Sequence, residues 1–81
     1  MLNWWVPRYH FHIRDHDHRL IMDEEGIELA DGAAALAEAT ISARDLAANA
    51  IREGRPIARG IEVTNESGEL LFTLPVRSVI H

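Results

Sequence analysis

The feature that most constrains the fold is the alanine-rich stretch DGAAALAEATISARDLAANAIREG at residues 31–54. Asp31 is a typical helix N-cap, and Gly54 followed by Pro56 is a typical helix end. At about 100° per residue, the apolar positions form one stripe. The stripe consists of Leu36, Ala39, Ala43, Leu46, Ala47, Ala50 and Ile51. We therefore predict one helix of about six turns, close to a sheet that supplies the large core residues.

The segment before this helix has the pattern of a β-hairpin. Its first strand alternates apolar and polar residues, namely Tyr9, Phe11 and Ile13 against His10, His12 and Arg14. A loop at residues 15–18 would pair Ile13 with Leu20 and Phe11 with Met22. This register gathers the large apolar side chains on one face of the sheet.

The segment after the helix predicts a second hairpin. Ile61 and Val63 alternate with polar residues, and the turn residues 65–68 follow them. We expect Val63 to pair with Leu70 and Ile61 to pair with Phe72. Pro75 lacks a backbone N–H, so the last strand should lie at a sheet edge or end there.

These elements predict an α+β fold of ββαββ order, a four-stranded antiparallel sheet with one helix packed on one face. The 81 residues suffice for a single domain, expected at residues 7–77 with a C-terminal tail at residues 78–81. The chain has no cysteine, which excludes disulfides and a thiolate zinc site. The expected core is Tyr9, Phe11, Ile13, Leu20, Met22, Leu36, Leu46, Ile61, Val63, Leu70, Phe72 and Leu74.

Charge and hydropathy narrow the classes of partner. A net charge of −5 argues against binding to nucleic acids or anionic membranes, which requires clustered cations. Residues 1–9 lack the basic and apolar regions of a secretory signal, and the chain has no apolar stretch long enough to span a bilayer. We therefore expect a cytoplasmic protein.

Four of the five histidines lie in YHFHIRDHDHRL, residues 9–20. On a strand, His10 and His12 share a face about 7 Å apart, with Asp23 opposite His10 in the expected register. His10, His12 and Asp23 could begin a zinc site, with His16 and His18 as further ligands. A solvated, titrating histidine face is the favoured interpretation, and a pH-sensitive contact is a further alternative. We expect no cofactor.

The sequence contains little that indicates catalysis. It has no cysteine nucleophile, no G-x-S-x-G elbow and no glycine-rich phosphate loop, and its serines lack a sequence-level base. The acid-rich run at residues 23–31 lacks the spacing of a calcium loop. Its negative charges are instead expected to stabilise the positive N-terminal end of the following helix. We predict that the chain is not an enzyme.

The outward sheet face is the expected interaction surface. In the predicted register it carries Ile21 and Leu71 beside His10 and His12. One helix covers only one face of a sheet, so we predict a homo-oligomer or a protein partner, with a twofold dimer as the commonest form. Protonation of histidines at such a contact between about pH 7 and pH 5.5 would weaken it.

Four segments carry a resemblance to a known family: PRYHFHIRD, DEEGIEL, ARDL and IEVTNESGELLFTLPV. Together they resemble short bacterial proteins with a domain of unknown function, over residues 7–77. The resemblance implies no established activity. It aligns His12 with the family's histidine, whereas His10 replaces a usual aromatic residue and His16 a usual glycine. It also implies that the family's start falls at Val6, so residues 1–6 would be a start-site extension or a disordered tail.

A more distant likeness is to small antitoxin-type domains. These also place a hairpin, a D-x-x-G stretch and an amphipathic helix in this order. That likeness implies a partner-binding or regulatory role, although the chain shows no helix-turn-helix or basic strand for DNA binding.

Overall fold

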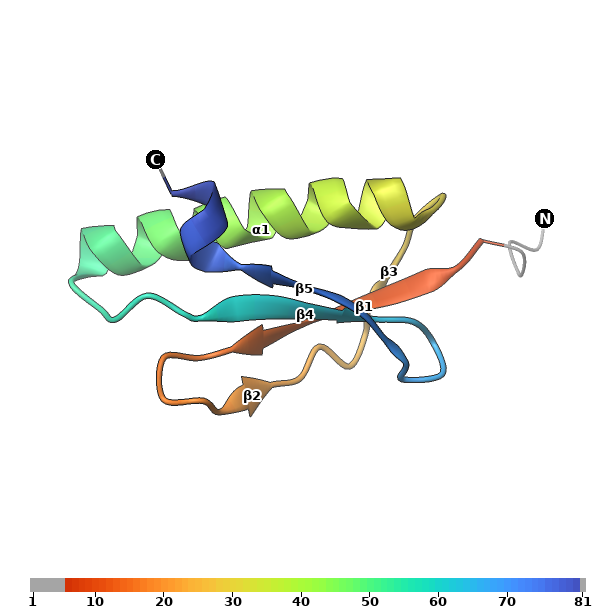
Figure 1. Cartoon of the computed structure of the whole chain (residues 1–81), viewed down its shortest axis with the longest axis horizontal. Helices are drawn as coiled ribbons and strands as arrows, with labels where there is room; N and C mark the ends of the chain where they lie inside the picture. Colours follow the sequence, from red (N-terminus) through yellow and green to blue (C-terminus); the bar gives the residue numbers. More distant parts are fainter. Residues whose placement is uncertain (1–5, 81) are drawn as a thin grey trace.

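The computed structural model describes residues 6–80, and the first five residues of the expected start-site extension lie outside this range. One antiparallel sheet packs one of its faces against one helix, which confirms the predicted α+β class (Figure 1). The strands follow the order β2-β1-β4-β5, and β3 also pairs with β1. The elements are β1 (Arg8–Arg14), β2 (Leu20–Ile21), β3 (Ile27–Glu28), α1 (Gly32–Glu53), β4 (Gly60–Thr64), β5 (Leu70–Pro75) and the 3₁₀ helix η1 (Val76–Val79).

Helix α1 has the predicted caps and buries an alanine face. The Asp31 carboxylate accepts a hydrogen bond from the Ala34 N–H at 2.9 Å, and Gly54 adopts the left-handed conformation at the other end. The buried residues are Ala35, Ala39, Ala43, Ala47 and Ala50. The prediction was wrong for Leu36 and Ile51, which are exposed because they lie on the border of this narrow stripe. In the described part of the chain, no helix is long and apolar enough to cross a membrane.

The first hairpin has a different register from the predicted one. Its loop contains three residues, because the Asp15 N–H donates to the Arg19 carbonyl at 2.8 Å and His18 adopts a left-handed conformation with φ of 72°. Ile13 therefore pairs with Ile21 rather than with Leu20. A shift of one residue exchanges the faces of a strand, so Ile21 lies on the helix side.

The expected second strand is broken into β2 and β3, which raises the number of strands from the predicted four to five. Ile21 pairs with Ile13, and Ile27 pairs with Tyr9. Residues 22–26 therefore stand opposite the shorter segment 10–12 and leave the ladder. Met22, expected in the core, lies in this excursion and is 58% exposed.

The second hairpin uses the same kind of three-residue loop, with Gly68 at φ of 84° in the position that His18 occupies in the first. Val63 pairs with Phe72, two residues beyond the expected partner, so the predicted apolar face is retained. A bulge follows, because Thr64 pairs with Leu70 and leaves Leu71 as the extra residue. Leu70, predicted to be buried, is 55% exposed.

The core lies between the alanine face of α1 and the strands. Its large buried side chains are Tyr9, Ile61, Val63 and Val76, and the partly buried ones packed against them include Phe11, Leu46, Phe72 and Leu74. Val76 belongs to η1, which folds back against α1 (Figure 1). Residues 78 and 79, expected in a C-terminal tail, are therefore part of a structured element, and residue 81 lies outside the described range.

Candidate functional site

The two histidines of β1 lie on one face of the sheet, as their spacing predicts. Their rings are stacked, with centroids 6.0 Å apart and planes 9° from parallel. His12 is only 6% exposed, in contrast to the solvated position expected for it. Burial of a polar ring requires hydrogen-bond partners, and the excursion between β2 and β3 supplies them.

Asp23 holds both rings through its main chain. Its N–H donates to Nδ1 of His12 at 2.9 Å, and Nδ1 of His10 donates to its carbonyl at 2.8 Å. Because a backbone N–H can only donate, Nδ1 of His12 carries no proton. The proton of the neutral ring is therefore on Nε2, which donates to the Thr64 hydroxyl at 3.1 Å. We call His10, His12 and Asp23 the histidine clamp.

The Asp23 carboxylate attaches the same excursion to β1. It accepts hydrogen bonds from the N–H groups of Phe11 and Gly26, both at 3.1 Å. Burial raises the pKa of Asp23, but these two bonds to the charged carboxylate outweigh it, so the pKa lies below its ordinary value. Gly26 is required here, since φ is 69° and a Cβ would lie 2.7 Å from the Tyr9 carbonyl oxygen.

This geometry has direct chemical consequences. His12 donates to Thr64 through Nε2, so it cannot accept the hydroxyl proton as a triad histidine would. Both Nδ1 atoms and both carboxylate oxygens of the clamp are engaged in hydrogen bonds. Metal ligation through either Nδ1 atom would break a bond that attaches Asp23 to β1, because each ring nitrogen has only one position for a proton or a ligand.

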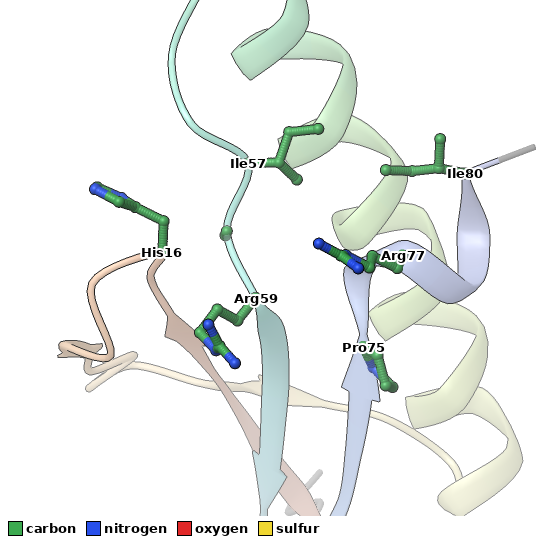
Figure 2. Close-up of a pocket in the computed structure, with 7 residues that line it drawn as sticks. His16, Ile57, Arg59, Pro75, Arg77 and Ile80 are labelled. Carbon is green, nitrogen blue, oxygen red and sulfur yellow. The ribbon is translucent and has the colours of Figure 1, made fainter.

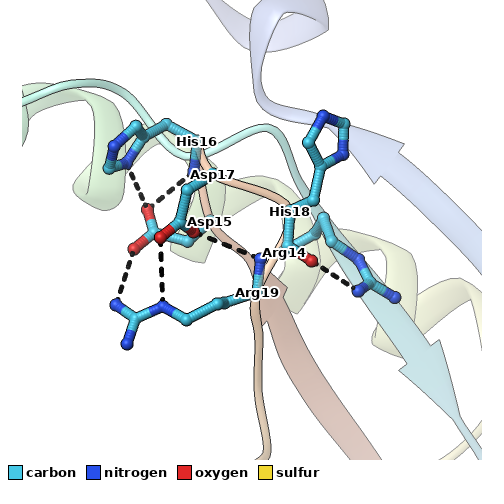
Figure 3. Close-up of polar contacts among 6 residues, drawn as sticks. All are labelled: Arg14, Asp15, His16, Asp17, His18 and Arg19. Carbon is cyan, nitrogen blue, oxygen red and sulfur yellow. Dashed lines mark hydrogen bonds and ion pairs between the residues drawn. The ribbon is translucent and has the colours of Figure 1, made fainter.

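His16 and His18, expected as further ligands, lie at the tip of the first hairpin instead (Figure 3). His16 donates to the Asp15 carboxylate from its backbone N–H at 2.8 Å, and its ring nitrogen lies 3.3 Å from the same oxygen. These bonds hold the pKa of Asp15 below its ordinary value. Among the described residues, Asp15, His16 and Asp17 bring their ligand atoms within 4.8 Å. Arg19 forms ion pairs with both carboxylates of this group, with Nε 3.1 Å from Asp17.

A bidentate ion pair covers the outward face next to the clamp. Arg14 donates to the two carboxylate oxygens of Glu62 at 2.8 and 3.1 Å. These bonds lower the pKa of Glu62. Among residues 6–80, no buried side-chain nitrogen or oxygen lacks a hydrogen-bond partner. The buried polar groups of the outward face therefore have partners, while the register also places Leu20, expected in the core, and Leu70 on this face.

The two predicted interaction residues lie at opposite edges of the sheet. Ile21 is on β2 and is 48% exposed, whereas Leu71 is on β5 and is 42% exposed. One twofold contact between identical edges cannot contain both. His10 and His12 are on β1, which β4 separates from β5.

Sequence reasoning missed two features that face solvent. Leu70 joins Leu71 at the β5 edge because of the bulge, which no residue type in this strand indicates. Arg59 and Arg77 line one cavity, although they are far apart in the chain. The only signal for their proximity is the register of the second hairpin, which places residue 59 beside residue 76.

Comparison with known families confirms the predicted resemblance. The model of the domain of unknown function DUF6894 matches residues 8–77, which include every strand and the helix. A search of curated proteins and a search of solved structures gave no significant match. By the match over nearly its whole length, the chain belongs to the DUF6894 family.

Proposed function

We propose that this domain is a non-catalytic homo-oligomerising module, and that β5 pairs with β5 of a second copy in a twofold dimer. The observation that carries this proposal is the composition of the β5 edge. Strand β5 pairs with β4 and with no other strand among residues 6–80. Its sequence, LLFTLP, contains no charged residue, and Leu70 and Leu71 are both exposed.

Proteins usually protect sheet edges with charges, because an unpaired edge accepts another strand. The opposite edge of this sheet is protected differently, since the histidine clamp divides it into two strands of two residues each. Strand β5 is longer, with six residues, and is a single strand whose one irregularity before Pro75 is the bulge at Leu71. An isologous contact would cover the same apolar residues on both copies.

The non-catalytic part of the proposal rests on the direction of the hydrogen bonds. His12 donates to Thr64. The Ser67 hydroxyl donates to the Asn65 side chain and the Ser78 hydroxyl donates to the Pro75 carbonyl, so both serines are engaged in local hydrogen bonds. Metal binding by the Nδ1 atoms of His10 and His12 would have to disrupt the clamp. The antitoxin-like alternative rests on element order alone.

Sedimentation velocity at micromolar concentration tests the proposal with a matched pair of variants. Leu71→Glu places a charge at the β5 edge, whereas Ile21→Glu places the same charge at a similarly exposed position of the other edge. We expect the wild type and Ile21→Glu to be dimers and Leu71→Glu to be a monomer. A monomeric wild type would refute self-association, and a dimer that survives Leu71→Glu would refute the β5 contact.

The same experiment at lower pH tests the position of the histidines. Because β4 separates the clamp from β5, we expect the dimer to persist between about pH 7 and pH 5.5, where histidine protonates. Dissociation over this range would place titrating histidines at the contact and contradict the β5 assignment.

A further inference from the structure

A cavity of about 580 Å³ opens where the first hairpin, the segment before β4 and η1 meet (Figure 2). Its volume is within the range of small-molecule sites. Ile57, Pro75 and Ile80 form apolar walls, and His16, Arg59 and Arg77 contribute polar groups. In Figure 2, Arg77 extends from η1 toward the segment that carries Ile57 and Arg59. No aspartate or glutamate lines the cavity.

The charges of Arg59 and Arg77 are uncompensated within the described residues. The chain has 13 acidic residues and eight basic ones, all of them arginine, so acidic partners are in excess. Four arginines pair with them, namely Arg8, Arg14, Arg19 and Arg55. Neither Arg59 nor Arg77 makes a side-chain hydrogen bond or ion pair with any of residues 6–80. Two guanidinium groups, which always remain charged, therefore share one cavity that residues 6–80 supply with no carboxylate.

The backbone that carries these arginines is firmly held. The Arg59 N–H donates to the Arg14 carbonyl at 2.8 Å, and the Arg59 carbonyl accepts from the Val76 N–H at 3.0 Å. Val76 is fully buried, so η1 is anchored immediately before Arg77. The two acids next to the lining residue His16 are Asp15 and Asp17, and both carboxylates form ion pairs with Arg19.

We propose that this cavity binds a small organic oxyanion, a carboxylate or a phosphate ester attached to an apolar group. Guanidinium groups recognise both oxyanions through paired N–H donors. The walls of Ile57, Pro75 and Ile80 fit the apolar part of such a ligand. The site is separate from the exposed leucines, which lie at the other end of β5, so its occupancy does not depend on self-association.

Chemical-shift titration of the ¹⁵N-labelled full chain tests this proposal. The probes are phenyl phosphate, benzoate, inorganic phosphate and the neutral benzyl alcohol. We expect saturable shifts of the backbone amides at residues 57–59 and 76–80 with at least one of the two aromatic anions. Which of them binds more tightly distinguishes a phosphate ester from a carboxylate. Inorganic phosphate and benzyl alcohol should each bind roughly tenfold more weakly. Inorganic phosphate lacks the apolar group, and benzyl alcohol lacks the negative charge.

Three variants with the same change of charge complete the test. Arg59→Gln and Arg77→Gln should each weaken binding of the preferred anion by about tenfold, and their spectra report whether the fold is intact. Arg44→Gln removes an exposed arginine of α1 outside the cavity and should leave the affinity unchanged. Absence of saturable shifts with both aromatic anions would overturn the proposal. The proposal would also be overturned if inorganic phosphate bound as tightly as the aromatic anions. It would likewise be overturned if Arg44→Gln weakened binding as much as Arg59→Gln and Arg77→Gln do.

Discussion

Removal of the Asp23 carboxylate is the most informative perturbation of the fold. Its two hydrogen bonds, from Phe11 and Gly26, attach residues 22–26 to β1. A hydrogen bond to a charged group contributes about 1.5 kcal/mol or more to stability. We therefore expect Asp23→Ala to lower the free energy of unfolding by about 3 kcal/mol, and the melting temperature by roughly 12–24 °C for a domain of this size.

Two further variants separate the hydrogen bonds from the charge. Asp23→Asn retains one acceptor oxygen and should cost about half as much as Asp23→Ala. Glu24→Ala removes an exposed neighbouring acid that makes no side-chain hydrogen bond to residues 6–80, so its effect should stay within about 0.5 kcal/mol. Urea denaturation followed by circular dichroism measures all three. If Asp23→Ala costs no more than Glu24→Ala, the carboxylate does not hold the excursion.

The pH dependence gives a second check on the same residue. The pKa of Asp23 is lower in the folded state than its ordinary value, so the charged carboxylate stabilises the fold above the unfolded pKa of about 3.9. This stability is lost as the pH falls through the folded pKa. The difference between wild type and Asp23→Asn should therefore be full at pH 7 and should shrink below about pH 4. A difference that is constant down to acid unfolding would contradict the hydrogen bonding of the ionised form.

Three other substitutions have defined outcomes in the same denaturation assay. Gly68→Ala should destabilise by about 1 kcal/mol, because φ is positive at this position of the second hairpin. His18→Asn should stabilise by about 0.5 kcal/mol, since asparagine tolerates the left-handed conformation better, and a loss of stability would contradict this. Asp31→Ala should cost about 1 kcal/mol through loss of the N-cap, and an unchanged stability would show that the cap is dispensable.

The sequence was sufficient for the helix and for the existence of two hairpins, but not for β3, η1 or the registers. Helix α1 follows from its caps and its apolar periodicity, and both hairpins follow from alternation. The registers depend on His18 and Gly68, whose left-handed conformations shorten each loop to three residues. Glycine commonly signals such a turn, whereas histidine rarely adopts it. The first register was therefore misjudged by one residue, which moved Ile21 to the helix side.

The candidate site was predicted as a set of residues but not as a structure. The spacing of His10 and His12 placed them on one face, and the structure joins Asp23 to both rings through its main chain. Their burial and the engagement of the Asp23 main chain depend on the break between β2 and β3. That break arises because five residues, 22–26, lie opposite three residues of β1, 10–12. The alternation of apolar and polar residues does not reveal such an excess. Pattern reasoning identifies which side chains share a face, but not which backbone groups reach them.

The histidine clamp also determines where this domain can meet other molecules. By attaching residues 22–26 to β1, it interrupts one sheet edge and occupies polar groups of the outward face. The Arg14–Glu62 pair neutralises charge on the same face, and α1 covers the other face. The uncharged β5 edge and the cavity that contains Arg59 and Arg77 are two places where apolar surface or charge lacks a partner among the described residues. Weakening the clamp with Asp23→Asn should therefore expose a second edge at β1 without altering either surface.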